Sequence, residues 1–423
     1  MKSLNYQNKA VSCEVLNRIA GVIGEDKIAK GERTIITPAT QADVTVAVKA
    51  IMDANGSVAS KKGKHCGEND VIFDFSSMKD IEFIDPVNMT VRVQVGCKFA
   101  DLEKAVNEKG FTLGARAGGA EATVEDWVYT EAPGVGSYKY GTVKDNVFNV
   151  IAVDCTGSVI ETGYDIIGYY MSGFNLTQTL VASSGRLAII TAVTLQMYPA
   201  GVTKSAAYEF AGPAEIQAAL AKMAQEPSVK PLHISFNENK VVVAFQGAED
   251  FVDLDLEATE TIFEGATKIE DDLWTGIEGA ECMCPKRPTF YIPVKNYADF
   301  INAAKDAGFK VAGNVPDCTT VTVKLRGSDA DLEPIIAKAE ELGGRYTGKC
   351  ATNYRTVETN TFVKKITEGF LGAKPKEPTF ARKVTPEIIA LLEEAVGKKN
   401  VNTNGMDRTI YCHDLAQIGR AHV

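Results

Sequence analysis

Two apolar runs, joined by a hairpin turn and a glycine-punctuated loop, constrain the fold of this chain more than any other feature. Residues 147–153 read VFNVIAV, a short β-branched run that is typical of a buried strand. Residues 155–158 predict a tight turn, and residues 159–163 return as the hairpin partner. After the loop, residues 187–199 form a longer apolar run that ends at Pro199. Three strands are therefore predicted here.

Regular elements are predicted on both sides of these strands. Thr40 and Asp43 are placed to cap a helix over residues 44–55, which Gly56 ends. The first half also contains an amphipathic helix over 11–28, strands at 34–38, 58–60 and 71–75, a hairpin over 81–96 and a helix over 99–109. From about residue 206, strands at 240–245 and 320–325 alternate with helices at 297–308 and 329–342.

Composition excludes several classes of protein. A chain of 423 residues with 45% hydrophobic and 24% charged residues is typical of a globular protein with two or more domains. The net charge of −10 argues against nucleic-acid binding, and no run is apolar enough for a signal peptide or a membrane span. We expect a cytoplasmic protein whose nine cysteines are free, and Cys282 and Cys284 give only a weak metal signal.

Three motifs carry a resemblance to a known family. Residues 139–146 read KYGTVKDN, residues 155–163 read CTGSVIETG, and residues 182–191 read ASSGRLAIIT. In this order they resemble the FAD-linked oxidases that include D-lactate dehydrogenase and the flavin subunit of glycolate oxidase. The resemblance implies an α+β fold, with a two-subdomain PCMH-type FAD-binding domain over 1–204 and an α+β cap domain over 205–370. It also implies that strands 147–153 and 187–197 share one sheet.

The same resemblance implies the residues that contact FAD, although the motifs that hold them are degenerate. The paired glycines that face the diphosphate in the family stand here as Glu125 and Asp126, which would cost several kcal/mol unless they turn away. The basic stretch 60–67 also reads as a solvated loop. The implied cofactor-binding residues are Lys62, Gly63, Lys64, His65, Gly118, Thr123, Gly141, Ser184, Gly185, Arg186 and Ile190.

The metal site of the family is not present in this sequence. Its two histidines correspond to Asn314 and Val321, its carboxylate to Lys349 and its base to Cys350. We expect Asn314, Val321 and Lys349 to cluster without forming a ligand set, so we expect no bound metal and identify no catalytic residue. Arg287 is a candidate for a substrate carboxylate, with a surface arginine as the alternative.

Three functions remain open from the sequence. The first is an FAD-dependent 2-hydroxy-acid dehydrogenase, in which FAD takes a hydride from the alcohol carbon. The second is a non-catalytic copy of that fold, serving as a structural half or subunit beside an active flavin module. The third is an unrelated small-molecule binding protein. The first two imply as partners a small 2-hydroxy acid and an electron-acceptor protein or second flavin module.

The C-terminal part of the sequence predicts a different organisation. Residues 364–383 are rich in Lys, Gly and Pro, and 371–383 are predicted to be a linker. Residues 384–389 repeat the pattern of 11–16, so 384–417 are expected to begin a second, truncated flavin module. The last six residues, IGRAHV, correspond to the translation of a sequencing adapter, and we expect 418–423 to derive from one.

Overall fold

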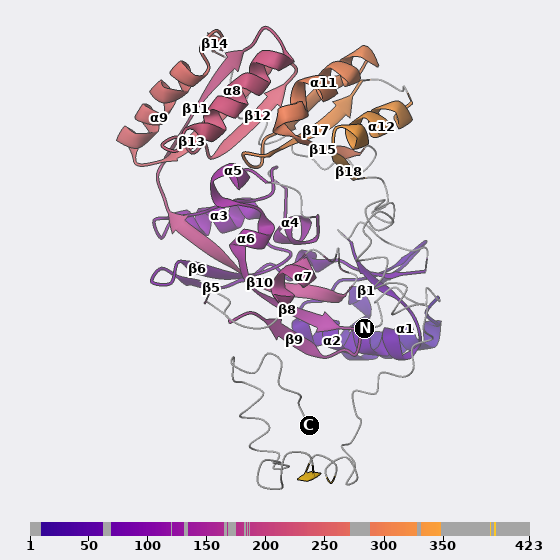
Figure 1. The fold of residues 1–423 in the computed structure, drawn as a ribbon. Helices are drawn as coiled ribbons and strands as arrows, with labels where there is room; N and C mark the ends of the chain where they lie inside the picture. Colours follow the sequence, from indigo (N-terminus) through magenta and orange to yellow (C-terminus); the bar gives the residue numbers. More distant parts are fainter. Residues whose placement is uncertain are drawn as a thin grey trace. The chain divides into compact units, whose positions relative to one another are not determined.

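The computed structural model describes residues 10–61, 69–119, 121–130, 134–164, 167, 175–181, 183, 185, 187–270, 288–327, 331–347, 390, 393 and 394 (Figure 1). The predicted linker, second flavin module and adapter-derived residues lie almost entirely outside this part. Residues Met1–Tyr170 and Phe174–Thr352 form one compact unit. All the elements described below belong to that unit.

The chain begins with a small four-stranded sheet, in the order β1–β2–β4–β3, and two helices. Strands β2, β4 and β3 are parallel, while β1 pairs with β2 in the antiparallel sense. The helices α1 and α2 contact each other, and α2 contacts β3. The elements are α1 (Cys13–Ile23), β1 (Ile28–Lys30), β2 (Thr34–Ile36), α2 (Gln41–Asp53), β3 (Val58–Ser60) and β4 (Val71–Phe73).

Local chemistry sets the ends of the first two helices. The Thr40 side chain accepts from the Asp43 backbone N–H, and the Asp43 carboxylate accepts from the Thr40 N–H, as the sequence predicts for α2. The predicted helix over 11–28 was too long. Gly24, with φ of +111°, ends α1 because helical backbone needs negative φ. The chain then turns into β1, which pairs with β2.

A second sheet has the order β5–β6–β10–β8–β9, and β7 also pairs with β10. Strands β8 and β10 are antiparallel neighbours, with Val153 opposite Ile189, so the expectation that 147–153 and 187–197 share one sheet is confirmed. Both strands are buried over most of their length. The strands are β5 (Ile81–Asp85), β6 (Thr90–Gln94), β7 (Phe111–Leu113), β8 (Val147–Asp154), β9 (Val159–Thr162) and β10 (Ala188–Pro199).

Short helices lie among these strands, and one hydrophobic core joins both sheets. That core runs from Ile19 in α1 to Met197 in β10, so the two subdomains are packed on each other. Trp127 and Tyr129 of α4 are among its largest fully buried side chains. The helices are α3 (Phe99–Asn107), α4 (Val124–Thr130), α5 (Ser137–Tyr140), α6 (Val143–Asn146) and α7 (Leu176–Val181).

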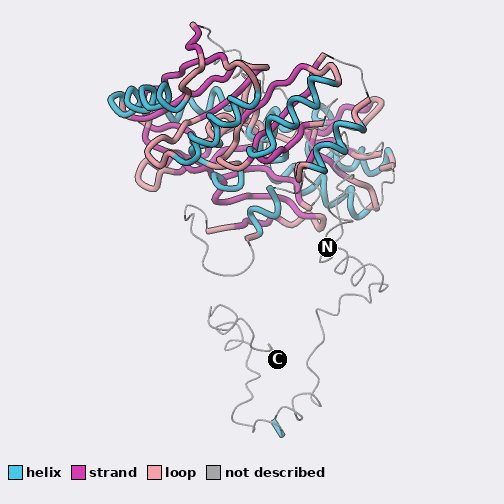
Figure 2. Tube along the Cα trace, turned by 45° about the horizontal axis from the view of Figure 1, so that its top comes forward, coloured by secondary structure: helices cyan, strands magenta, loops and turns pink. Residues whose placement is uncertain are grey.

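The cap is an eight-stranded sheet in the order β14–β11–β13–β12–β16–β17–β15–β18, built only from antiparallel pairs. It has its own hydrophobic core, to which four helices contribute, and Figure 2 shows helices lying over its strands. The strands are β11 (Val202–Glu209), β12 (His233–Asn237), β13 (Lys240–Gly247), β14 (Thr267–Ile269), β15 (Thr289–Pro293), β16 (Lys310–Asn314), β17 (Thr320–Arg326) and β18 (Arg345–Thr347). The helices are α8 (Pro213–Gln225), α9 (Glu249–Ile262), α11 (Tyr297–Asp306) and α12 (Glu333–Glu341).

Specific polar contacts join the cap to α5 of the flavin domain. The Lys139 ammonium donates to the carbonyl oxygen of Gln246, the residue before the last of β13. The Tyr140 hydroxyl donates to the Gln246 side-chain oxygen at 3.5 Å. Burial lowers the pKa of Lys139, although the carboxylate of Asp255 partly opposes that shift. Gln246 is thereby held in place by two side chains of the KYG segment.

Candidate functional site

Several predicted site residues lie outside the part of the chain that the structure describes. They comprise the four candidates of the first loop, two residues of the third motif, the candidate substrate arginine and the two last positions of the metal motif: Lys62, Gly63, Lys64, His65, Ser184, Arg186, Arg287, Lys349 and Cys350. Gly118, Thr123, Gly141, Gly185 and Ile190 are described. The second and third motifs can therefore be built up from their contacts.

The second motif begins α4, but its first amides are already bonded within the protein. The backbone N–H of Val124 donates to the Cys97 oxygen at 2.9 Å, and that of Glu125 donates to the Val95 oxygen at 2.7 Å. The Asp126 N–H donates to the Thr123 hydroxyl oxygen at 3.3 Å, and the Asp126 carboxylate accepts from Thr123 in return. The backbone N–H groups of residues 124–126 therefore all have partners within the protein. Thr123 and Asp126 bond to each other in the pattern of a capping box.

Glu125 points into the protein, with only 3% of its surface exposed. Its carboxylate accepts a hydrogen bond from the hydroxyl of Ser60, which is itself 1% exposed. Ser60 is the last residue of β3, directly before the predicted phosphate loop. A buried carboxyl group therefore stands at the start of that loop, where the diphosphate of a flavin dinucleotide is expected.

Tyr129 connects the second motif to the third. It lies one helical turn after Glu125, and its hydroxyl oxygen accepts from the backbone N–H of Ile190 at 2.8 Å. A Cβ atom added at Gly185 would come within 3.2 Å of its ring, so the ring fills the space beside that glycine. Burial, and then the charge of Glu125, raise the pKa of Tyr129. We refer to Ser60, Glu125, Tyr129 and Ile190 as the Glu125 cluster.

The other two described cofactor candidates lie beside different groups. Gly141 ends α5 with φ of +80°, and an added Cβ would come within 2.6 Å of the Asp145 carboxylate. Thr142 and Asp145 form a capping box of their own for α6. Gly118 follows Arg116 by two residues, in the segment between β7 and α4. Of the described candidates, Ile190 belongs to the Glu125 cluster, Gly185 lies against its Tyr129 ring, and Thr123 bonds to the neighbouring Asp126.

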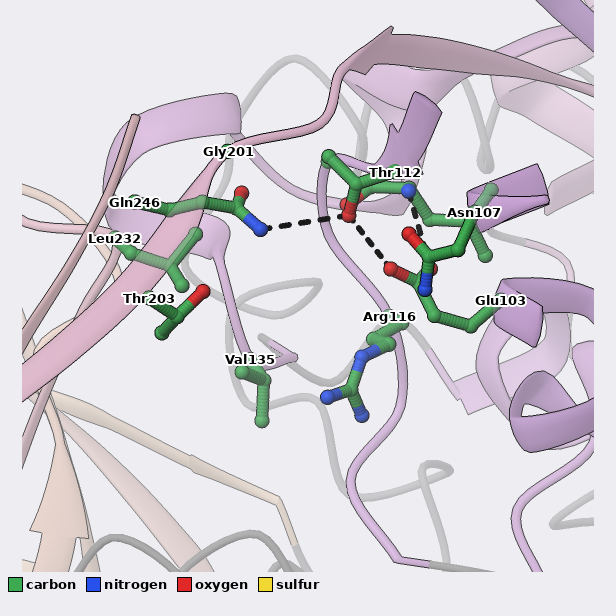
Figure 3. A pocket seen from close by; sticks show the side chains of 11 residues that line it. Glu103, Asn107, Thr112, Arg116, Val135, Gly201, Thr203, Leu232 and Gln246 are labelled. Carbon is green, nitrogen blue, oxygen red and sulfur yellow. Dashed lines mark hydrogen bonds between the residues drawn. The ribbon is translucent and has the colours of Figure 1, made fainter. Parts of the chain in front are cut away.

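A separate pocket of ≈ 200 Å³ opens between the flavin domain and the cap (Figure 3). The charged side chains in it are Arg116, between β7 and α4, and Glu103 of α3. We call it the Arg116 pocket. Its lining residues are Glu103, Asn107, Thr112, Leu113, Gly114, Arg116, Val135, Gly201, Thr203, Leu232 and Gln246.

Sequence reasoning missed the residues of this pocket as well as Ser60 and Tyr129. Their roles come from contacts between segments far apart in the chain: Gln246 lies 134 residues from Thr112, to which its side-chain nitrogen donates at 3.5 Å. The one signal available was that Arg116 is the only residue of the stretch 114–119 that is neither alanine nor glycine.

The two described positions of the family's metal motif, Asn314 and Val321, lie on opposite faces of the cap sheet. Asn314 pairs directly with Thr322 across β16 and β17 and bonds to its hydroxyl, with the Asn314 carbonyl accepting at 3.1 Å. Val321 precedes Thr322, so it projects from the opposite face, where it belongs to the cap core. The expectation that Asn314 and Val321 cluster is wrong, because strand alternation separates them. In the described residues, no group of three or more His, Cys, Asp and Glu is placed to hold a metal ion.

Comparisons with known proteins agree with this two-subdomain flavin fold. Residues 33–163 match the family described as "FAD binding domain". The chain is 31% identical over 170 residues to an uncharacterised FAD-linked oxidoreductase of Mycobacterium tuberculosis, covering 38% of this chain and 37% of that protein. It is 31% identical over 132 residues to D-lactate dehydrogenase of Archaeoglobus fulgidus, covering 31% of this chain and 29% of that protein.

A solved structure of p-cresol methylhydroxylase with substrate bound superposes with a TM-score of 0.66 at 14% identity, over 86% of this chain and 96% of that one. The expected fold class is therefore confirmed: a PCMH-type, α+β FAD-binding domain followed by a cap. The resemblance expected from the sequence is confirmed over residues 33–163, which match an FAD-binding domain, and the relatives that share this region are named D-lactate dehydrogenase and FAD-linked oxidoreductase. The chain spans well under two thirds of those two relatives.

FAD is the cofactor of this domain family, but the second motif does not fit its diphosphate. The amides of residues 124–126 are bonded to Cys97, Val95 and Thr123. Two phosphate charges beside the Glu125 carboxylate would each repel it by roughly 1–4 kcal/mol at ~4 Å, depending on the local dielectric.

Proposed function

We propose that the whole protein is an FAD-linked oxidoreductase of the 2-hydroxy-acid dehydrogenase type, in which the described part of this chain is a non-catalytic copy of the flavin fold. It acts as a structural half or subunit beside an active flavin module. The family match over 33–163 and the relatives named D-lactate dehydrogenase support the first half of this proposal. A small 2-hydroxy acid would be the substrate of the active module.

The observation that carries the second half is the buried Glu125 carboxylate on the Ser60 hydroxyl. A cofactor site keeps its donors available for the ligand, whereas here the donors at the start of α4 are bonded to the protein itself. The cap agrees, because the two described positions of the family's metal motif are an asparagine and a core valine. Neither binds a metal as a histidine does.

A second candidate is that this chain is itself the dehydrogenase, with FAD taking the hydride from the alcohol carbon. Its identity of 31% to D-lactate dehydrogenase of Archaeoglobus fulgidus favours that function. The candidate residues of the first loop and Arg287 belong to this alternative. So does an electron-acceptor protein as partner, whereas the non-catalytic copy needs a second flavin module.

The domain boundaries at 204 and 370, the module expected from 384 and the cytoplasmic location stay predictions. Among the described residues, no helix combines the length and the apolar composition that crossing a membrane requires.

The visible absorption spectrum of the purified 423-residue chain separates the two candidates. The chain is incubated with excess FAD, desalted and scanned, and then assayed with D-lactate or glycolate and a reducible dye. We expect no flavin bands and no dye reduction. D-lactate dehydrogenase of Archaeoglobus fulgidus, treated in the same way, serves as the positive control. Stoichiometric flavin that D-lactate bleaches would establish the catalytic alternative instead.

A further inference from the structure

Helix α9 carries an apolar surface that the cap core does not use. One face of α9 contacts β11 and β13, and Val252 and Thr259 are buried there. Phe251 and Leu254 are 69% and 58% exposed, the highest fractions of any large hydrophobic side chain among the described cap residues. They stand three residues apart, so they lie side by side on the helix. Figure 1 shows α9 at the end of the cap opposite α12. The two side chains therefore form an exposed apolar surface at this end of the cap.

Carboxylates surround this apolar surface. The 14 residues of α9 include six acidic and no basic side chains. Three of the six pair with lysines of β11 and β14: Glu249, Asp253 and Glu260. Asp250 and Glu257 stand four residues before and three residues after Leu254, on its side of the helix, and neither has a salt bridge to a described residue. We call Asp250, Phe251, Leu254 and Glu257 the α9 patch.

The charge of the patch selects among the molecules that could cover it. A second copy of this chain would bring the same carboxylates against these, and the net charge of −10 adds to the repulsion. Anionic lipid headgroups and nucleic-acid phosphates are repelled for the same reason. A protein surface that places lysine or arginine around apolar side chains instead complements both the charge and the exposed apolar area. Charge complementarity therefore favours a basic protein partner.

We propose that the α9 patch binds a basic amphipathic helix of a partner protein. The apolar face of that helix covers Phe251 and Leu254, and its lysine and arginine side chains pair with Asp250 and Glu257. Helix α9 is about 21 Å long at 1.5 Å per residue, which matches a partner helix of about four turns. The identity of the partner rests on the proposed function, in which it is the active flavin module, whereas the chemistry of the patch does not.

Fluorescence anisotropy of labelled synthetic peptides, titrated with the full chain, tests the patch. The probe is a helix of leucine and lysine, about four turns long, with all leucines on one face. The comparisons are a leucine–glutamate helix of the same pattern and a lysine–glycine peptide of the same charge as the probe. We expect the probe to bind, the leucine–glutamate helix not to bind, and the lysine–glycine peptide to bind about tenfold more weakly than the probe, because it has no apolar face.

Variants of the chain locate the binding. The double variant Phe251→Ser, Leu254→Ser should weaken binding of the leucine–lysine helix about tenfold, and Asp250→Asn with Glu257→Gln about fivefold. Val22→Ser is the matched control, since Val22 is 65% exposed on α1, and it should leave binding unchanged.

The proposal is overturned if the two basic peptides bind equally, because charge alone then explains the binding, or if the serine double variant binds as the wild type does. Sedimentation of both proteins checks for a second copy: a wild-type dimer that the double variant lacks would overturn the proposal in favour of self-association. A chain that binds both FAD and the leucine–lysine helix would contradict the proposed function and leave the patch standing. A chain that binds neither would contradict the patch alone.

Discussion

The Glu125 cluster and the Arg116 pocket place charged side chains in opposite ways. In the cluster, the carboxylate points into the core, is 3% exposed and accepts from Ser60. In the pocket, the Arg116 guanidinium and the Glu103 carboxylate line a space of ≈ 200 Å³. The first carboxylate is buried in the core, whereas the second lies at the wall of a pocket and accepts from Thr112 and Leu113.

The difference shows that one fold can bury one carboxylate in its core and leave another at the wall of a pocket. The Glu125 cluster draws Glu125 and Ile190 from the second and third motifs, and adds Ser60 from the end of β3 and Tyr129 from α4. The pocket is made by the cap strands β11 and β13 against α3 and β7, which lie outside those motifs.

The largest effect we predict comes from His233, which lies next to the pocket residue Leu232. His233 is 1% exposed, and burial, followed by the positive charge of Arg116, lowers its pKa to about 3. The unfolded chain takes up this proton near the ordinary pKa of ~6.5, while the folded chain does not until about pH 3. Above pH 6.5, His233 is neutral in both states and the free energy of unfolding is at its full value. As the pH falls from 6.5 toward 3, this free energy decreases by up to about 5 kcal/mol.

Urea unfolding of the wild type and His233→Gln between pH 7 and pH 4 measures this loss. The wild type should lose about 1.4 kcal/mol more per pH unit than the variant below pH 6. The other histidines are present in both proteins, so their contributions cancel. Parallel pH curves would mean that His233 titrates normally and that the Arg116 charge is screened from it.

The next largest effect tests whether the Glu125 cluster excludes the cofactor. Glu125→Gly removes one buried carboxylate beside the expected diphosphate, and a repulsion of roughly 1–4 kcal/mol corresponds to about 5- to 1,000-fold in affinity. Titration of FAD followed by flavin fluorescence should therefore show weak or absent binding to the wild type and a clear gain in the variant. Glu121→Gly is the control, because Glu121 is an exposed carboxylate of the same segment. Tight wild-type binding that Glu125→Gly leaves unchanged would place the diphosphate elsewhere.

The sequence predicted the fold well where local chemistry decides it. The β-branched runs at 147–153 and 187–197 became the paired strands β8 and β10, and Thr40 with Asp43 began α2. The end of α1 was misplaced because the positive φ of Gly24, which ends the helix, leaves no mark in the apolar spacing. Periodicity describes which residues can share a face and does not locate a backbone turn.

The site was less predictable because its contacts are not local. Ser60 and Glu125 are 65 residues apart, and nothing in either segment indicates their hydrogen bond. Glu125 and Asp126 look equivalent in the sequence, yet adjacent helical positions differ by about 100° in direction. One carboxylate therefore turns into the core and the other back to Thr123.

That difference between neighbours gives the smallest effect we predict. The Asp126 carboxylate accepts from the Thr123 N–H at 3.0 Å and from the Thr123 hydroxyl at 2.9 Å, so it serves the start of α4. Asp126→Ala should cost about 1 kcal/mol in the free energy of unfolding, and Asp126→Asn less, because an amide oxygen still accepts. Neither should change the FAD titration, since this carboxylate is already turned toward its own helix start. Urea unfolding and the flavin titration of both variants, beside Glu125→Gly, measure the two effects separately. A gain in FAD affinity from Asp126→Ala as large as that from Glu125→Gly would show that both carboxylates face the diphosphate, and that the capping contacts open when it binds.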